Sequence, residues 1–476
     1  MTTPTATPPR NPAAARPGKG RDVLLDLIRS GAIALVVVQH WLMPVITRDG
    51  DALVAGNALS APGAWAWTWV GQVMPLVFFA SGAAGAISWA RTKAKGGDAA
   101  GWLVGRLHRL VLPVAALVVV WLPLPVVLLA LGVPGQPLHL AASTVPQLLW
   151  FLVVQLILVA LTPLTVALHR RSGLAVLIPL VLGAAATDVL RFAGVPLVGY
   201  VNAILVWVAV HQVGVAYADG RFAGLGRRGA ALVGVAGLAA TAALVGFGPY
   251  PASMIGMPGA PVSNMSPPTL CLVTLAIAQL GVLFALKPAL VRFATWRPVA
   301  RGLAVLAPRT MTVFLWHMSA LVVGVGVLTL GVGSHTPDPF GPLWLAGAPL
   351  WIGGLLVVLV VLVRAFGSWE TRSTTAGRRG ASPVAVYAGL VLAAAGMLGL
   401  AARGFAPHVD AGLLAVVAEP AAWSALVAVG YLLATRPVPA RLTARFRLTA
   451  PCRLTARRRL TAPRGATRSS ARPARA

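Results

Sequence analysis

The chain has 476 residues, of which 58% are hydrophobic and 11% are charged, and its mean hydropathy is +0.81. Soluble domains carry about 25% charged residues, so this composition excludes an ordinary soluble enzyme. The net charge of +28 suggests a nucleic-acid binder, unless the basic residues are concentrated between membrane spans.

The N-terminal segment, residues 1–20, is rich in Pro and Ala. It lacks the apolar core and the cleavage site of a signal peptide, so we expect a disordered cytoplasmic leader. The two cysteines, Cys271 and Cys452, are too few for a disulfide framework.

Twelve apolar segments follow, each long enough to cross a membrane, which predicts an all-α, polytopic transmembrane helix bundle. They are centred near residues 35, 78, 121, 157, 181, 208, 239, 279, 320, 354, 392 and 422. With the N-terminus in the cytoplasm, all 39 Lys and Arg residues except Arg48, Arg191 and Arg403 fall on the cytoplasmic side. Cytoplasmic loops carry an excess of Lys and Arg, so we expect a multi-pass protein of the cell membrane with both termini cytoplasmic.

The first span carries an ordered set of polar side chains. Arg29 and His40 are eleven residues apart, so they share a helix face to within about 20° and lie about 16 Å apart along the axis. Asp26 precedes Arg29 by three residues and can pair with it. Charged groups in a span usually face a bundle interior or an aqueous cavity, which indicates a functional stripe. The alternative is an interfacial histidine beside Trp41.

Several segments, in order, resemble the membrane acyltransferase-3 family of integral-membrane O-acyltransferases. The first is the opening motif that runs from Arg21 through Asp26 and Arg29 to His40. The others are Met74-Pro-Leu-Val-Phe-Phe-Ala-Ser81-Gly82, Arg106-Leu-His-Arg109-Leu-Val-Leu-Pro113, Trp150-Phe-Leu and Thr312-Val-Phe-Leu-Trp316-His317-Met318. The resemblance covers residues 21–365, and it departs from the family where Ala83 replaces the usual Phe.

The resemblance implies transfer of a short acyl group from cytoplasmic acyl-CoA to a hydroxyl of a cell-surface glycan or a secreted small molecule. His40 is then expected to be the general base, because an imidazole titrates near neutral pH. Arg29 and Asp26 are expected to support it, and Arg106 and Arg109 to bind the donor phosphates. The expected lining residues are Ser81, Trp316 and His317. No cofactor and no metal are expected.

Simpler interpretations of the same residues stay open. Arg106 and Arg109 can be ordinary topology charges, and His317 can be a buried structural histidine. His211 has no assigned role, and Glu419 is expected to be isolated in the last span. The alternative function is a twelve-span secondary transporter, which would show pseudo-symmetric halves.

Two additional spans over residues 366–435 follow the core, and the chain ends in an Arg-rich segment over residues 436–476. That segment repeats RLTA four times at a six-residue period, beginning at Arg441, Arg447, Arg453 and Arg459. This period matches neither a helix nor a heptad. We therefore expect a disordered cytoplasmic tail near anionic lipids and no nucleic-acid partner.

Overall fold

The computed structural model describes residues 22–50, 52–372, 382–410 and 412–436, which belong to one compact unit. Arg21, the leader over residues 1–20 and the tail beyond Arg436 lie outside the described residues. The expectations of a disordered leader and a lipid-bound tail therefore stay predictions.

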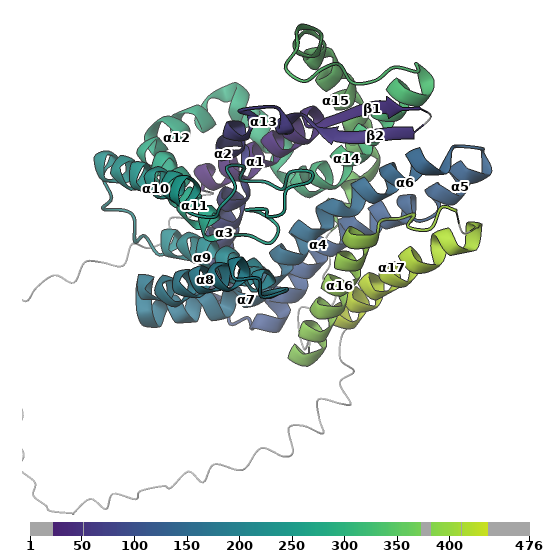
Figure 1. The fold of residues 1–476 in the computed structure, drawn as a ribbon. Helices are drawn as coiled ribbons and strands as arrows, with labels where there is room; N and C mark the ends of the chain where they lie inside the picture. Colours follow the sequence, from purple (N-terminus) through teal and green to yellow (C-terminus); the bar gives the residue numbers. More distant parts are fainter. Residues whose placement is uncertain (1–21, 51, 373–381, 411, 437–476) are drawn as a thin grey trace, which may run out of the picture. The chain divides into compact units, whose positions relative to one another are not determined.

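Long helices form most of the described unit (Figure 1). They are α1 (Val23–Leu42), α3 (Met74–Ala94), α4 (Ala99–Trp121), α7 (Leu149–Ser172), α8 (Leu177–Phe192), α9 (Asn202–Ala218), α10 (Arg227–Phe247), α11 (Leu270–Ala285), α14 (Thr310–Gly326), α15 (Pro342–Thr371), α16 (Pro383–Arg403) and α17 (Leu413–Thr435). Shorter helices connect them: α2 (Trp67–Gly71), α5 (Leu124–Ala130), α6 (Gly135–Thr144), α12 (Lys287–Thr295) and α13 (Arg297–Leu306).

A short hairpin is the exception to the all-α expectation. Strands β1 (Pro44–Asp49) and β2 (Ala52–Asn57) pair antiparallel directly after α1. The turn residue Gly50 has φ +58°, which a glycine adopts without steric cost. The strand residue Ile46 donates its backbone N–H to the hydroxyl of Thr336, which lies between α14 and α15. Its carbonyl accepts a hydrogen bond from the Thr336 backbone N–H. The end of the bundle that carries β1 and β2 is called the hairpin end below.

The membrane character of the helices is confirmed, whereas the number of spans stays a prediction. Among the described residues, ten helical segments are long and apolar enough to cross a membrane, or eleven with the bent pair α11 and α12. One of the ten, Gly135–Phe192, runs for 58 residues and contains both α7 and α8. A single crossing needs about 20 residues, so this segment is longer than one straight span requires.

The third long helix begins earlier than the sequence suggested. The segment expected to be centred near residue 121 is α4, and it ends at Trp121. Its first turn is capped by Asp98, whose carboxylate accepts a hydrogen bond from the Gly101 backbone N–H over 2.7 Å. Arg106 and Arg109 consequently lie inside α4.

An aromatic cluster joins four helices in the middle of the core. Phe78 of α3 packs on Phe151 of α7 and on Trp207 of α9, with ring centroids 5.3 and 4.7 Å apart. Phe151 in turn lies 5.0 Å from the ring of Phe314, on α14. The aromatic residues of the second motif therefore support the helix that carries His317.

The glycine of the same motif has a packing role. A Cβ added to Gly82 would lie 2.0 Å from the carbonyl oxygen of His211, and one added to Gly214 would lie 2.0 Å from that of Phe79. Helices α3 and α9 therefore touch backbone to backbone, as small residues allow in membrane proteins.

The arginine-bearing helix ends lie together. Near the start of α1, Asp22 accepts a hydrogen bond from Tyr217 at the end of α9, and His169 at the end of α7 lies 3.4 Å from Asp219. Arg227, which begins α10, donates to the Ala285 carbonyl at the end of α11. These contacts hold several helix ends that carry arginines close together. This end of the bundle is called the arginine end below.

The two C-terminal helices, α16 and α17, pack against each other and against α4 (Figure 1). Glu419 is not isolated, contrary to expectation, because it forms an ion pair with Arg403 and lies 2.9 Å from His408. The sequence could not show this pairing because it depends on how α16 and α17 are packed.

Candidate active site

Two histidines from distant parts of the chain meet at the hairpin end of α1. The Nδ1 atom of His40 lies 2.8 Å from Nε2 of His317. The rings are nearly parallel, with planes 9° apart. His317 is fully buried, whereas His40 is half-buried. The structure therefore brings together the two histidines that the motifs had indicated separately.

Tryptophans hold the histidine pair in place. Trp41, next to His40, donates its indole N–H to the His317 carbonyl over 2.9 Å. Its own carbonyl accepts from the indole of Trp351 on α15 over 2.8 Å. Trp316 stacks on Phe366, with ring centroids 4.0 Å apart, and so fixes α14 against α15.

The hydrogen bonds determine the tautomers of the neutral rings. The Phe314 carbonyl lies 2.6 Å from Nδ1 of His317 and can only accept, so this Nδ1 carries the proton. Nε2 of neutral His317 is then an acceptor, and Nδ1 of His40 must donate to it. Nε2 of His40 then carries a lone pair and no proton.

His40 borders a cavity of about 200 Å³. Among its described lining residues His40 is the only titratable side chain, and Gln39, Gln72 and Ser266 add neutral polar groups. Trp150 and Phe151 contribute aromatic surface. The cavity is small compared with ligand pockets of about 300–1,000 Å³, so it suits part of a ligand.

One wall of this cavity comes from the uncharged loop between α10 and α11, residues 248–269. The loop is fastened to α2 and the turn after it, since Met254 donates its backbone N–H to Thr68 and accepts from the Gln72 amide. On the other side, buried Asp188 accepts hydrogen bonds from the Tyr250 hydroxyl and from the Leu270 backbone. Burial and the Asp188 carboxylate raise the pKa of Tyr250, which keeps the phenol a donor.

The predicted donor-binding arginines lie at the arginine end. Arg106 donates to the Ser88 hydroxyl, and its guanidinium lies 5.3 Å from the ring centre of Trp102. Arg106 also interacts electrostatically with Arg109 and Arg29. Arg29 is exposed although it lies within a span. Two other guanidinium groups therefore lie within electrostatic range of Arg106.

A carboxylate that sequence reasoning missed borders the same site. Glu370, in the last turn of α15, accepts hydrogen bonds from the backbone N–H groups of Met311 and Thr312 over 3.1 and 2.8 Å, and from the Thr312 hydroxyl. It also interacts electrostatically with Arg29. Glu370 thus caps α14, the helix of His317. A lone acidic residue near the end of an apolar helix was the available signal.

The other predicted residues lie apart from the cavity. Ser81 accepts a hydrogen bond from Gln155 over 2.6 Å, and His211 lies 3.4 Å from the Thr162 hydroxyl. Asp26 is one turn before Arg29 on α1. Within the described residues, no group of three or more His, Cys, Asp or Glu could hold a metal ion.

The fold and site define a polytopic membrane protein with a histidine pair beside a cavity, and with Arg29 of the same helix near two arginines of α4. A family model described as an acyltransferase domain matches residues 22–369, which is more than half of the chain. The chain belongs to the acyltransferase-3 family and is a multi-pass membrane acyltransferase. No curated protein and no solved structure gives a significant match.

Proposed function

We propose that this acyltransferase moves a short acyl group from acyl-CoA to a hydroxyl of a cell-surface glycan or a secreted small molecule, with His40 as the general base. The observation that carries the proposal is the hydrogen-bond chain from the Phe314 carbonyl through His317 to His40. This chain leaves the Nε2 lone pair of His40 available beside the cavity.

The step follows from these positions. The acceptor hydroxyl oxygen attacks the thioester carbonyl carbon while Nε2 of His40 takes the hydroxyl proton. The new C–O bond forms, the C–S bond breaks, and the thiolate of coenzyme A recovers the proton from His40. His317 accepts from Nδ1 of His40 throughout, so it holds the productive tautomer and stabilises the imidazolium.

The donor enters, in this proposal, from the arginine end, which faces the cytoplasm. Its phosphates bind Arg106, Arg109 and Arg29, and Asp26 supports Arg29 on the same helix. Helix α1 rises about 16 Å between Arg29 and His40, so the donor extends along α1 to bring its thioester to the base. No resident cofactor takes part.

The acceptor binds, in this proposal, in the cavity beside His40. Because the lining is uncharged apart from that histidine, we expect a neutral hydroxyl-bearing group, and the volume of about 200 Å³ favours one that enters end-on. Family membership also favours this function over the transporter alternative.

The test compares a deletion strain complemented with wild-type protein, with His40→Ala, or with the control His408→Ala. His408 is exposed and contacts Glu419, so this control removes an imidazole away from the cavity. We expect surface glycans or secreted metabolites to lose an acyl mass in the deletion strain and with His40→Ala only, since loss of a general base costs about 10²–10⁴-fold in rate. Wild-type acylation by a stably inserted His40→Ala protein would overturn the mechanism.

A further inference from the structure

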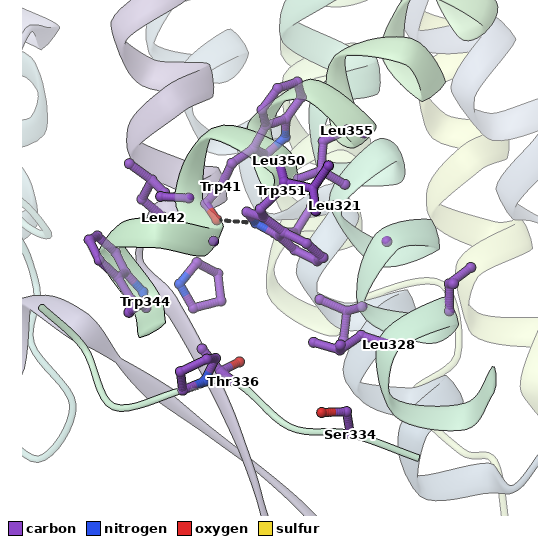
Figure 2. A pocket seen from close by; sticks show the side chains of 18 of the residues that line it. Trp41, Leu42, Leu321, Leu328, Ser334, Thr336, Trp344, Leu350, Trp351 and Leu355 are labelled. Carbon is purple, nitrogen blue, oxygen red and sulfur yellow. Dashed lines mark hydrogen bonds between the residues drawn. The ribbon is translucent and has the colours of Figure 1, made fainter. Parts of the chain in front are cut away.

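A second, larger hollow lies at the hairpin end and is lined in part by Trp41, the neighbour of His40. Its volume is about 510 Å³, and its walls come from α1, α14, α15 and the segment between α14 and α15 (Figure 2). Part of this wall is a short π-helical stretch, Val327–Gly331, which widens the end of α14. We call this hollow the α14–α15 groove.

Glycines shape the α14–α15 groove. A Cβ on Gly324 would lie 2.3 Å from the Leu355 side chain, so α14 and α15 are in close contact at the floor. By contrast, a Cβ on Gly347 or Gly354 would meet nothing within 4 Å, and both glycines line the groove. Side chains at these two positions of α15 would therefore occupy part of the groove that is now empty.

The chemistry of the walls changes along the groove. Leu321, Trp351 and Leu355 surround one part, while Ser334 and Thr336 lie at the other end beside the hairpin (Figure 2). None of the described lining residues is Asp, Glu, Lys or Arg. This gradient matches an amphiphile with a hydrocarbon chain and a polar group at one end.

The surroundings identify the source of such a molecule. Only 11% of the most apolar 18-residue stretch of α15 is buried within the protein. Leu350, which lines the groove, is 82% exposed. Exposed apolar surface on a membrane-spanning helix contacts lipid, so the groove opens onto the bilayer. We propose that the α14–α15 groove binds one acyl chain of a membrane phospholipid, with the head group beside Ser334 and Thr336.

The bound chain packs against the support of the histidine pair. Trp41 and Trp351 both line the groove, and a hydrogen bond joins the Trp351 indole to the Trp41 carbonyl (Figure 2). The Trp41 indole donates on its other side to the His317 carbonyl. Lipid in the groove therefore contacts two of the tryptophans that hold the histidine pair.

The test uses the full-length protein in nanodiscs that contain a phosphatidylcholine with a photoreactive diazirine near the end of one acyl chain. After irradiation, mass spectrometry maps the labelled peptides. The variant Gly354→Leu fills the groove, and Gly353→Leu is its matched control, since Gly353 also has open space but does not line the groove. Gly347→Leu provides a second filled groove if Gly354→Leu fails to insert.

We expect label on the groove-lining segments 321–328 and 351–358 of the wild type. Filling the groove should lower this label about tenfold, which corresponds to a loss of about 1.4 kcal/mol in binding free energy. Gly353→Leu should keep it. Equal labelling of wild type, filled-groove variants and control, or label confined to outward-facing residues of α15, would overturn the proposal. Because the readout is covalent labelling, it is independent of whether acyl transfer is observed.

Discussion

Replacing His317 tests whether the second histidine works by accepting a hydrogen bond. The variant His317→Phe fills the buried site without an acceptor, whereas His317→Gln can place an amide oxygen near the former Nε2 position. In the wild type this Nε2 lies 2.8 Å from Nδ1 of His40, and the bond becomes charge-assisted when His40 takes the proton.

The expected loss of kcat follows from the positive charge that His40 gains when it takes the proton. Hydrogen bonds to charged groups contribute about 1.5–3 kcal/mol, so losing the bond should lower kcat by roughly 10–150-fold. His317→Gln should recover part of the loss. The KM for the acyl donor should change little, because the arginine cluster is a separate site.

The assay is steady-state transfer from radiolabelled acyl-CoA to the acceptor by protein in nanodiscs, with the thermal unfolding midpoint measured in parallel. Ser319→Ala is the control, because Ser319 is buried on the same helix and contacts Trp121. Wild-type kcat for His317→Phe would refute the reasoning. An equal loss for Phe and Gln would also refute it, since the acceptor would then be irrelevant.

Three further changes probe other parts of the structure. Arg106→Ala should raise the KM for acyl-CoA several-fold, and donor kinetics equal to wild type would contradict phosphate binding. Glu370→Ala should destabilise the protein by about 0.5–2 kcal/mol in thermal unfolding, as loss of a helix cap does; an unchanged midpoint would count against that role. Gly82→Ala should cost about 1–3 kcal/mol through overpacking on His211, whereas the control Gly105→Ala, which has open space, should not; equal midpoints would contradict the close packing.

Local sequence patterns were sufficient for the helical, membrane-spanning class. The length of an apolar segment decides whether it can span a bilayer, and the distribution of Lys and Arg orients it. Both properties can be taken from the sequence alone. The span expected near residue 121 is centred too late, since α4 runs over Ala99–Trp121 and includes Arg106 and Arg109. In the folded protein Ser88 and Trp102 surround the Arg106 guanidinium, which allows the helix to contain it.

The site was only partly predictable. The motifs indicated His40 and His317, but no local pattern shows that residues 277 positions apart share a hydrogen bond. Glu370 was missed because its partners are backbone N–H groups of another helix. The hairpin after α1 is too short to leave a strong periodic signal beside neighbouring helices.

The loop between α10 and α11 has a consequence for how this protein can diversify. It forms one wall of the His40 cavity, yet its anchors, such as Asp188 and Gln72, are separate from the histidine pair. Substitutions at Ile255 or Met265 would alter the cavity without changing the hydrogen bonds of His40 and His317. Under the proposed function, the choice of acceptor can thus evolve, or be engineered, by exchanging a loop while the histidine pair is left unchanged.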